Sequence, residues 1–143
     1  MGANPITRSQ VNQQTDMQKA TVSSSLKYKE LIRTALSELE KVGIAALFPN
    51  LDRGRAKKDV NLEFMKQLEK EHFEAIDDSE ALYVISPQGC VGTLVSVEIG
   101  YARAQGKPII FSEKPEDLGL QALATRYLPL KEVKKLKDLD LEI

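Results

Sequence analysis

The sequence has no tryptophan, one cysteine (Cys90) and one histidine (His72), and this scarcity excludes several kinds of chemistry. A single cysteine cannot form an intrachain disulfide, and one cysteine with one histidine cannot build a Cys/His zinc site within the chain. Any catalytic triad that needs an imidazole has to use His72. We therefore expect no metal and no other cofactor, and a chemistry that depends mainly on carboxylates and hydroxyls.

The chain also lacks an excess of charge of either sign, with 20 basic and 21 acidic side chains and a formal net charge of −1. Proteins that bind nucleic acids displace counterions with a basic surface, so this balance argues against a nucleic-acid partner. No run approaches the roughly 18 apolar residues of a membrane span. The polar N-terminus has no signal-peptide core. We expect a cytoplasmic protein with no membrane partner.

The composition is that of one globular domain. The 143 residues are 42% hydrophobic and 29% charged. A chain of this length buries a sizeable core without disulfides or metal. Residues 1–18 are polar and rich in Gln and Asn, and we predict a flexible tail there. Residues 19–143 then form the single domain.

Helical and strand patterns alternate along this domain. Apolar residues recur at steps of three and four over 26–42, which predicts an amphipathic helix, and Gly43 is the expected left-handed cap. Asn61 or Asp59 is the expected N-cap of a second helix, and Thr93 that of a third helix ending near Gln105. The other predicted elements are strands at 20–22, 44–48, 81–85, 108–111 and 126–128, a short helix at 118–124, and a terminal helix from 130.

Strands that are apolar throughout and alternate with helices indicate a parallel sheet covered on both faces. We therefore predict a single-domain, three-layer α/β sandwich of the flavodoxin or Rossmann type. Its five parallel strands are expected in the order 2-1-3-4-5. In that order the first and third strands are neighbours whose chains leave in opposite directions. Ligands of such folds bind in the crevice beyond the carboxyl ends of these two strands.

Two loops rich in small and hydroxyl residues are expected to meet at that crevice. The first contains the serines at 23–25, and the second runs from Ser86 to Thr93. Each leads into a helix N-terminus, where backbone N–H groups attract phosphate or carboxylate. The second loop resembles a short phosphate- or ribose-binding loop. It matches neither the P-loop nor the dinucleotide-binding pattern.

Glu98 is the strongest candidate for chemistry. It lies in the first turns of the third predicted helix and is a charged residue in an otherwise apolar stretch. Because a helix N-terminus stabilises an anion, we expect Glu98 to be ionised and available for a nucleophilic or electrostatic role. An ordinary carboxylate near a helix N-terminus is the commoner explanation of such a residue.

Three weaker candidates remain open. Cys90 becomes a nucleophile only where His72 lies beside it, and a structural cysteine is the commoner case. Arg53, Arg55 and Lys57 form a basic loop that either steers a phosphate or is simply solvated. His72 lies near the end of the second helix, where a histidine is also explained by the helix dipole.

Several of these segments together resemble one family. They are His72–Ser79, Tyr83–Ile85, Gly89–Thr93, Glu98–Ala102 and Gly106–Ile110. They are similar to the nucleoside 2-deoxyribosyltransferase-like superfamily, which includes the deoxyribosyltransferases and the 2'-deoxynucleoside 5'-monophosphate N-glycosidases. The resemblance covers about residues 20–112 and is most specific over 91–110.

The resemblance implies cleavage of an N-glycosidic bond. Glu98 matches the family's catalytic glutamate, which attacks the anomeric carbon and forms a glycosyl-enzyme intermediate that water or an acceptor base resolves. The partner is then a small nucleoside or nucleotide. Members commonly complete their sites with a neighbouring subunit, which implies a homo-oligomer. The residues that the resemblance assigns to the sugar and any 5'-phosphate are Ser23, Ser24, Ser25, Gly89 and Gly92.

Two departures from the family pattern affect the expected activity. Active members carry an Asp near the end of the second helix that handles the proton of the base, and His72 stands there. A neutral imidazole still acts as acid or base near pH 7. The family's second acidic or hydroxyl residue corresponds to Gly92 or its neighbours, and Thr93 and Ser96 are close enough to substitute. The sequence therefore leaves three functions open. The chain is an enzyme that cleaves or transfers at an N-glycosidic bond, a catalytically silent nucleotide-sensing module with the same pocket, or a doubly wound protein without a nucleotide role.

Overall fold

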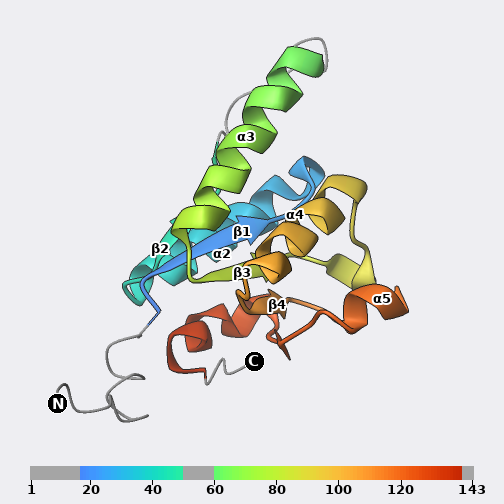
Figure 1. The fold of residues 1–143 in the computed structure, drawn as a ribbon. Coiled ribbons are helices and arrows are strands. Elements are labelled where there is room, and N and C mark those ends of the chain that lie inside the picture. Colours follow the sequence, from blue (N-terminus) through green and yellow to red (C-terminus); the bar gives the residue numbers. More distant parts are fainter. Residues whose placement is uncertain (1–16, 50–59, 140–143) are drawn as a thin grey trace, which may run out of the picture.

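The computed structural model describes residues 17–49 and 60–139. The basic loop predicted at 53–57 and most of the predicted tail lie outside them. Within the described residues, strands and helices alternate (Figure 1). The elements are β1 (Lys19–Ser23), η1 (Leu26–Tyr28), α2 (Lys29–Lys41), β2 (Ala45–Leu47), α3 (Leu62–Asp78), β3 (Ala81–Val84), η3 (Pro87–Gly89), α4 (Thr93–Ala104), β4 (Ile109–Phe111), α5 (Leu118–Gln121), β5 (Arg126–Tyr127) and η4 (Leu130–Asp138).

The strands form one parallel sheet in the order β2-β1-β3-β4-β5, which confirms the predicted topology. β1 and β3 pair from Ala20 opposite Ala81 to Ser23 opposite Val84, so the two strands end side by side. The chain leaves β1 toward α2 and leaves β3 toward α4. The sheet therefore has its switch point at the carboxyl ends of β1 and β3, where the ligand crevice is expected.

The central strand β3 is buried on both faces because its side chains alternate between two cores. Tyr83 packs in a core with residues of α2 and η4, whereas Leu82 and Val84 pack in a second core with residues of α3 and α4. Helices thus cover both faces of the sheet, and the three-layer α/β sandwich is confirmed (Figure 1).

The last two residues of the predicted tail contact the sheet and its core. Met17 is 6% exposed and belongs to the core shared with α2. The backbone N–H of Gln18 donates a hydrogen bond to Glu80 Oε1 over 2.9 Å. The predicted tail therefore includes two residues that pack with the sheet.

Of two predicted helix starts, one differs in the structure and one is confirmed. Gly92 is the N-cap of α4, and Thr93 is its first helical residue. The first backbone bond of the helix, from the N–H of Ser96 to the carbonyl of Gly92, explains this start because an N-cap needs only an extended backbone and this acceptor. Asn61 is the N-cap of α3, and its side chain accepts from the N–H of Phe64, as one of the two predicted alternatives requires.

The predicted C-terminal helix is present as η4, and it is a 3₁₀ helix. Its apolar residues recur at every third position, from Leu130 through Val133 and Leu136 to Leu139. Val133 and Leu136 are fully buried. A 3₁₀ helix has three residues per turn, so this spacing places all four side chains on the face that packs against α2.

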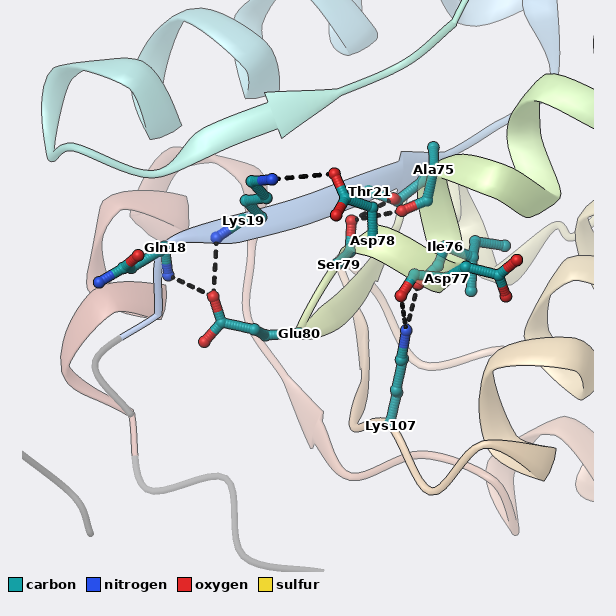
Figure 2. Close-up of polar contacts among 10 residues, drawn as sticks. All are labelled: Gln18, Lys19, Thr21, Ala75, Ile76, Asp77, Asp78, Ser79, Glu80 and Lys107. Carbon is teal, nitrogen blue, oxygen red and sulfur yellow. Dashed lines mark hydrogen bonds and ion pairs between the residues drawn. The ribbon is translucent and has the colours of Figure 1, made fainter. Parts of the chain in front are cut away.

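The end of α3 is fixed to the sheet by polar contacts (Figure 2). Thr21 Oγ1 donates to Ser79 Oγ over 2.6 Å, and Ser79 Oγ donates to the carbonyl of Ala75 over 2.8 Å. Lys107 Nζ donates to carbonyls of the last turn of α3, with 2.8 Å to that of Asp77. A cation at this position complements the negative end of the helix dipole.

Asp77 also ties α3 to α4. Its Oδ1 accepts from Tyr101 Oη over 2.6 Å and from Gln105 Nε2 over 2.8 Å. The Tyr101 bond, then the Gln105 bond, holds the pKa of the Asp77 carboxyl below its usual value. Asp77, in the last turn of α3, thus has a structural role, because it fixes the relative positions of the two helices that carry the site described below.

Candidate functional site

A cavity of about 370 Å³ lies at the predicted switch point, between the end of β1, α3 and the start of α4. This volume is in the range of sites for small molecules. Its wall combines apolar side chains with carboxyl, imidazole and hydroxyl groups. The lining residues are Ser24, Ser25, Leu26, Phe48, Met65, Leu68, Glu69, His72, Gly92, Thr93, Leu94, Val95 and Glu98.

Glu98 is the most buried carboxyl of this cavity. Only 4% of the residue is exposed, although its helix carries several exposed positions. Ser23, the last residue of β1, donates a hydrogen bond from Oγ to Glu98 Oε1. The same oxygen lies 3.5 Å from His72 Nε2. Glu98 is therefore not an ordinary surface carboxylate, because its side chain is held between β1 and α3.

Glu98 is protonated at neutral pH, which corrects the expectation of an ionised side chain. Burial raises the pKa of Glu98 to about 9, and the hydrogen bond from Ser23 opposes this rise. The sequence argument relied on the helix N-terminus. That effect decays within the first turn, and Glu98 is the sixth residue of α4, so desolvation dominates.

His72 is a neutral, hydrogen-bonded imidazole. Burial lowers its pKa to about 4, and the backbone contact with Val22 opposes this shift. His72 Nε2 lies 3.2 Å from the Val22 carbonyl oxygen, so Nε2 carries the hydrogen and donates it. The Phe48 ring packs edge-on against the imidazole, with centroids 5.0 Å apart. These contacts fix the ring beside Glu98 with its N–H on the Val22 carbonyl.

Glu69 is a second carboxyl of the cavity, which the sequence patterns did not single out. It lies on α3 one turn before His72, and burial raises its pKa. Its Oε1 is buried and has no hydrogen-bond partner among the described residues. A hydrogen bond joins the carboxyl groups of Glu69 and Glu98. One sequence signal was available, since Glu69 interrupts the apolar face that Met65 and Leu68 begin.

Five of the predicted binding residues surround this cavity. Ser24, Ser25, Gly92 and Thr93 line it, two from each of the predicted loops. Ser23 contributes through its bond to Glu98. The two loops therefore meet as the topology predicted.

Gly89 and Ser96 do not line the cavity. The backbone of Gly89 has a φ of +81°, and a Cβ there would lie 2.8 Å from the carbonyl oxygen of Lys114, so this part of the loop packs tightly beneath the surface. Ser96 Oγ donates to the carbonyl of Gly92 over 3.0 Å. Cys90 is exposed and outside the cavity wall, so the structure does not bring it to the imidazole.

The groups around the cavity suit an organic ligand with several hydroxyls. In the part of the chain that the structure describes, no three His, Cys, Asp or Glu side chains are grouped to hold a metal ion. No helix of that part is long and apolar enough to cross a membrane. Carboxyl and hydroxyl groups bind sugar hydroxyls, and the apolar wall of Leu26, Phe48 and Leu94 suits a flat ring.

Comparisons with known proteins identify the fold. No family model and no curated protein matches the sequence. The solved structure of a 2-deoxyribosyltransferase from Bacillus psychrosaccharolyticus superposes with a TM-score of 0.65 at 16% identity, over 85% of this chain and 92% of that chain. A conserved protein from Enterococcus faecalis V583 gives a TM-score of 0.55 at 17% identity, over 84% of this chain and 99% of that chain. The chain therefore has the nucleoside 2-deoxyribosyltransferase-like fold that its motifs predicted.

Proposed function

We propose that this chain binds a nucleoside or nucleotide in the cavity and cleaves or transfers at its N-glycosidic bond, with Glu98 as the nucleophile. The observation that carries the proposal is the buried Glu98 carboxyl, held by Ser23 at the end of β1 and lining the cavity at the switch point of the sheet. The likeness to a 2-deoxyribosyltransferase supports sugar transfer from nucleosides in general.

The residues around Glu98 have different roles in binding the ligand. The hydroxyls of Ser24, Ser25 and Thr93 are placed to hold the sugar, because they line the cavity on both sides of the crevice. His72 donates its Nε2–H to the Val22 carbonyl, which holds the imidazole in place 3.5 Å from Glu98 Oε1. The Phe48 ring packs against the imidazole and offers an apolar surface to the nucleobase of the ligand.

The proposed reaction has two steps. In the first, a Glu98 oxygen forms a bond to the anomeric carbon of the sugar while the bond to the base nitrogen breaks. The sugar is then attached to Glu98 as an ester. In the second step, water or a second base attacks the same carbon and releases Glu98, as in retaining glycosidases.

A panel of nucleosides and nucleoside 5'-monophosphates tests this proposal. We expect at least one ribose or deoxyribose compound to raise the melting temperature, since a ligand of the folded state stabilises it by mass action. Chromatography of the same mixture is expected to show free base. Free bases and free deoxyribose, tested separately, are the controls. No stabilisation and no base release across the panel would contradict the proposal.

One observation favours a second candidate, the catalytically silent nucleotide-binding module. Glu98 is protonated at neutral pH, and a protonated carboxyl is a poor nucleophile. This candidate predicts stabilisation by a nucleoside or nucleotide with no base released over hours. The same panel therefore separates the two functions.

The proposal includes a homo-oligomer in which a second copy covers α3 and α4. Val60 and Leu62, at the start of α3, are 42% and 68% exposed, and Leu94 and Val97 of α4 are 41% and 49% exposed. The two helices pack against each other, and Leu94 also lines the cavity. A second copy that buries these side chains would lie at the rim of the site. These exposed apolar side chains, on the two helices that carry the site, form the surface that we propose for the interface.

Sedimentation of two charge variants tests this association. We expect the wild-type chain to sediment as a dimer or larger species, and Leu62→Glu and Val97→Glu to lower its mass, because a buried unpaired carboxylate opposes association. Leu118→Glu is the matched control, since Leu118 is 79% exposed on α5. A monomeric wild-type chain, or an equal effect of all three variants, would refute the interface.

A further inference from the structure

A carboxyl group attacks carbon only as its anion, yet Glu98 is buried and protonated at neutral pH. Attack therefore needs a neighbouring group that takes the proton. Ser23 cannot do so, because its hydroxyl donates to Glu98. His72 is unsuited as well, because the ring nitrogen that faces Glu98 already carries a hydrogen and donates it to the Val22 carbonyl.

Glu69 is the neighbour with a free acceptor. It lines the same cavity, and its carboxyl is hydrogen-bonded to that of Glu98. Burial raises the pKa of Glu69 and the bond with Glu98 opposes that rise, whereas the same bond adds to the rise that burial causes in the pKa of Glu98, so Glu98 is the donor and Glu69 the acceptor. Among the described residues, Glu69 Oε1 has no hydrogen-bond partner although it is buried. A buried acceptor without a partner is costly unless a ligand uses it.

We infer that Glu69 takes the proton of Glu98 when the substrate is bound and delivers it to the departing base. This inference rests on the function proposed above. The O–H bond of Glu98 breaks and its proton moves to the Glu69 carboxylate. The freed Glu98 oxygen bonds to the anomeric carbon while the carbon–nitrogen bond breaks and its electron pair stays on the base. The base then takes the proton from Glu69, which is a carboxylate again.

Among the described residues that line the cavity, Glu69 is the group suited to this role. The titratable side chains of this part of the wall are Glu69 and His72 from α3 and Glu98 from α4. The segment after β1 contributes hydroxyls and apolar atoms. The resemblance places the proton-handling residue at His72, and the structure moves this chemistry one helical turn toward the start of α3.

The leaving group tests the role of Glu69. We expect Glu69→Gln to lower kcat for an ordinary purine nucleoside by roughly 10²- to 10⁴-fold, the usual contribution of a positioned acid. A 7-methylpurine nucleoside already carries its positive charge and leaves without an added proton. For that substrate, assayed at the alkaline pH where Glu98 is ionised, we expect the loss to stay below about 10-fold. Glu74→Gln is the matched control, because Glu74 is exposed on the same helix.

Carboxyl titration followed by carbon-13 NMR adds a readout that needs no activity. Glu69→Gln is expected to lower the pKa of Glu98, because the Glu69 charge and its hydrogen bond both raise it, and Glu74→Gln is expected to leave it unchanged. Equal losses of kcat for both substrates, or an unchanged Glu98 titration, would overturn the role of Glu69 and leave the proposed function standing. A wild-type chain that releases no base from any substrate would overturn the proposed function and the transfer step with it.

Discussion

Glu98→Gln is expected to lower the rate of base release roughly 10⁴-fold or more, the scale seen when a nucleophile is removed. The amide cannot attack the anomeric carbon. Its shape and charge match the protonated carboxyl that the folded chain contains at neutral pH, and its oxygen can still accept the bond from Ser23 Oγ. Melting temperature near neutral pH is therefore expected to change little. The measurements are chromatographic assay of free base and thermal unfolding of the same preparations.

Binding separates this result from a loss of the pocket. Because Ser24, Ser25 and Thr93 are untouched, the variant is expected to keep the stabilisation that a nucleoside gives to the wild-type chain. Glu74→Gln makes the same chemical change on an exposed part of α3 and is expected to keep full activity. A Glu98→Gln protein that is folded and releases base at the wild-type rate would show that the nucleophile lies elsewhere.

The sheet and its order could be predicted because their causes are local or topological. A strand such as 81–85 is apolar at every position since both of its faces are covered, and the structure shows its side chains divided between two cores. Right-handed crossovers then leave few arrangements for alternating strands and helices. The meeting of the two loops follows from that order, and Ser24, Ser25, Gly92 and Thr93 do line one cavity.

The protonation of the site could not be predicted from the sequence, because it depends on contacts between distant elements. Glu98 is shielded from solvent because β1 and α3 cover it, and its hydrogen-bond partner Ser23 lies 75 positions away in the chain. In the sequence, Glu69 and Glu74 are both acidic residues of the same predicted helix. Packing alone places Glu69 at the cavity and Glu74 in solvent. The helix η4 is a different case, since a helix was predicted there and its three-residue apolar spacing already indicates the 3₁₀ type.

Stability is expected to fall as the pH rises above about 6.5, which is the second large effect of the buried Glu98. The pKa of Glu98 is about 9 in the folded chain against an ordinary 4.5, so between these values the folded state holds a proton that the unfolded state has lost. The free energy of unfolding then decreases by up to about 1.4 kcal/mol per pH unit. The contribution of Glu98 to stability is complete below pH 4.5 and is lost progressively as the pH rises toward 9.

The titration of His72 gives the free energy of unfolding the opposite pH dependence below about pH 6.5. Its pKa is about 4 in the folded chain against an ordinary 6.5, so the unfolded state binds the extra proton between these values and stability rises with pH there. The slopes of Glu98 and His72 cancel between about pH 4.5 and 6.5, and the slope of Glu98 continues from 6.5 to 9, after that of His72 has ended.

Urea unfolding across the pH range checks this balance. Glu98→Gln is expected to remove the decline above 6.5, so its advantage in unfolding free energy over the wild-type chain grows as the pH approaches 9, while Glu74→Gln keeps the wild-type slope. Parallel curves for Glu98→Gln and the wild-type chain in this range would mean that Glu98 titrates normally. The proton that Glu69 is inferred to carry would then have no source at neutral pH, because Glu98 would already be the anion.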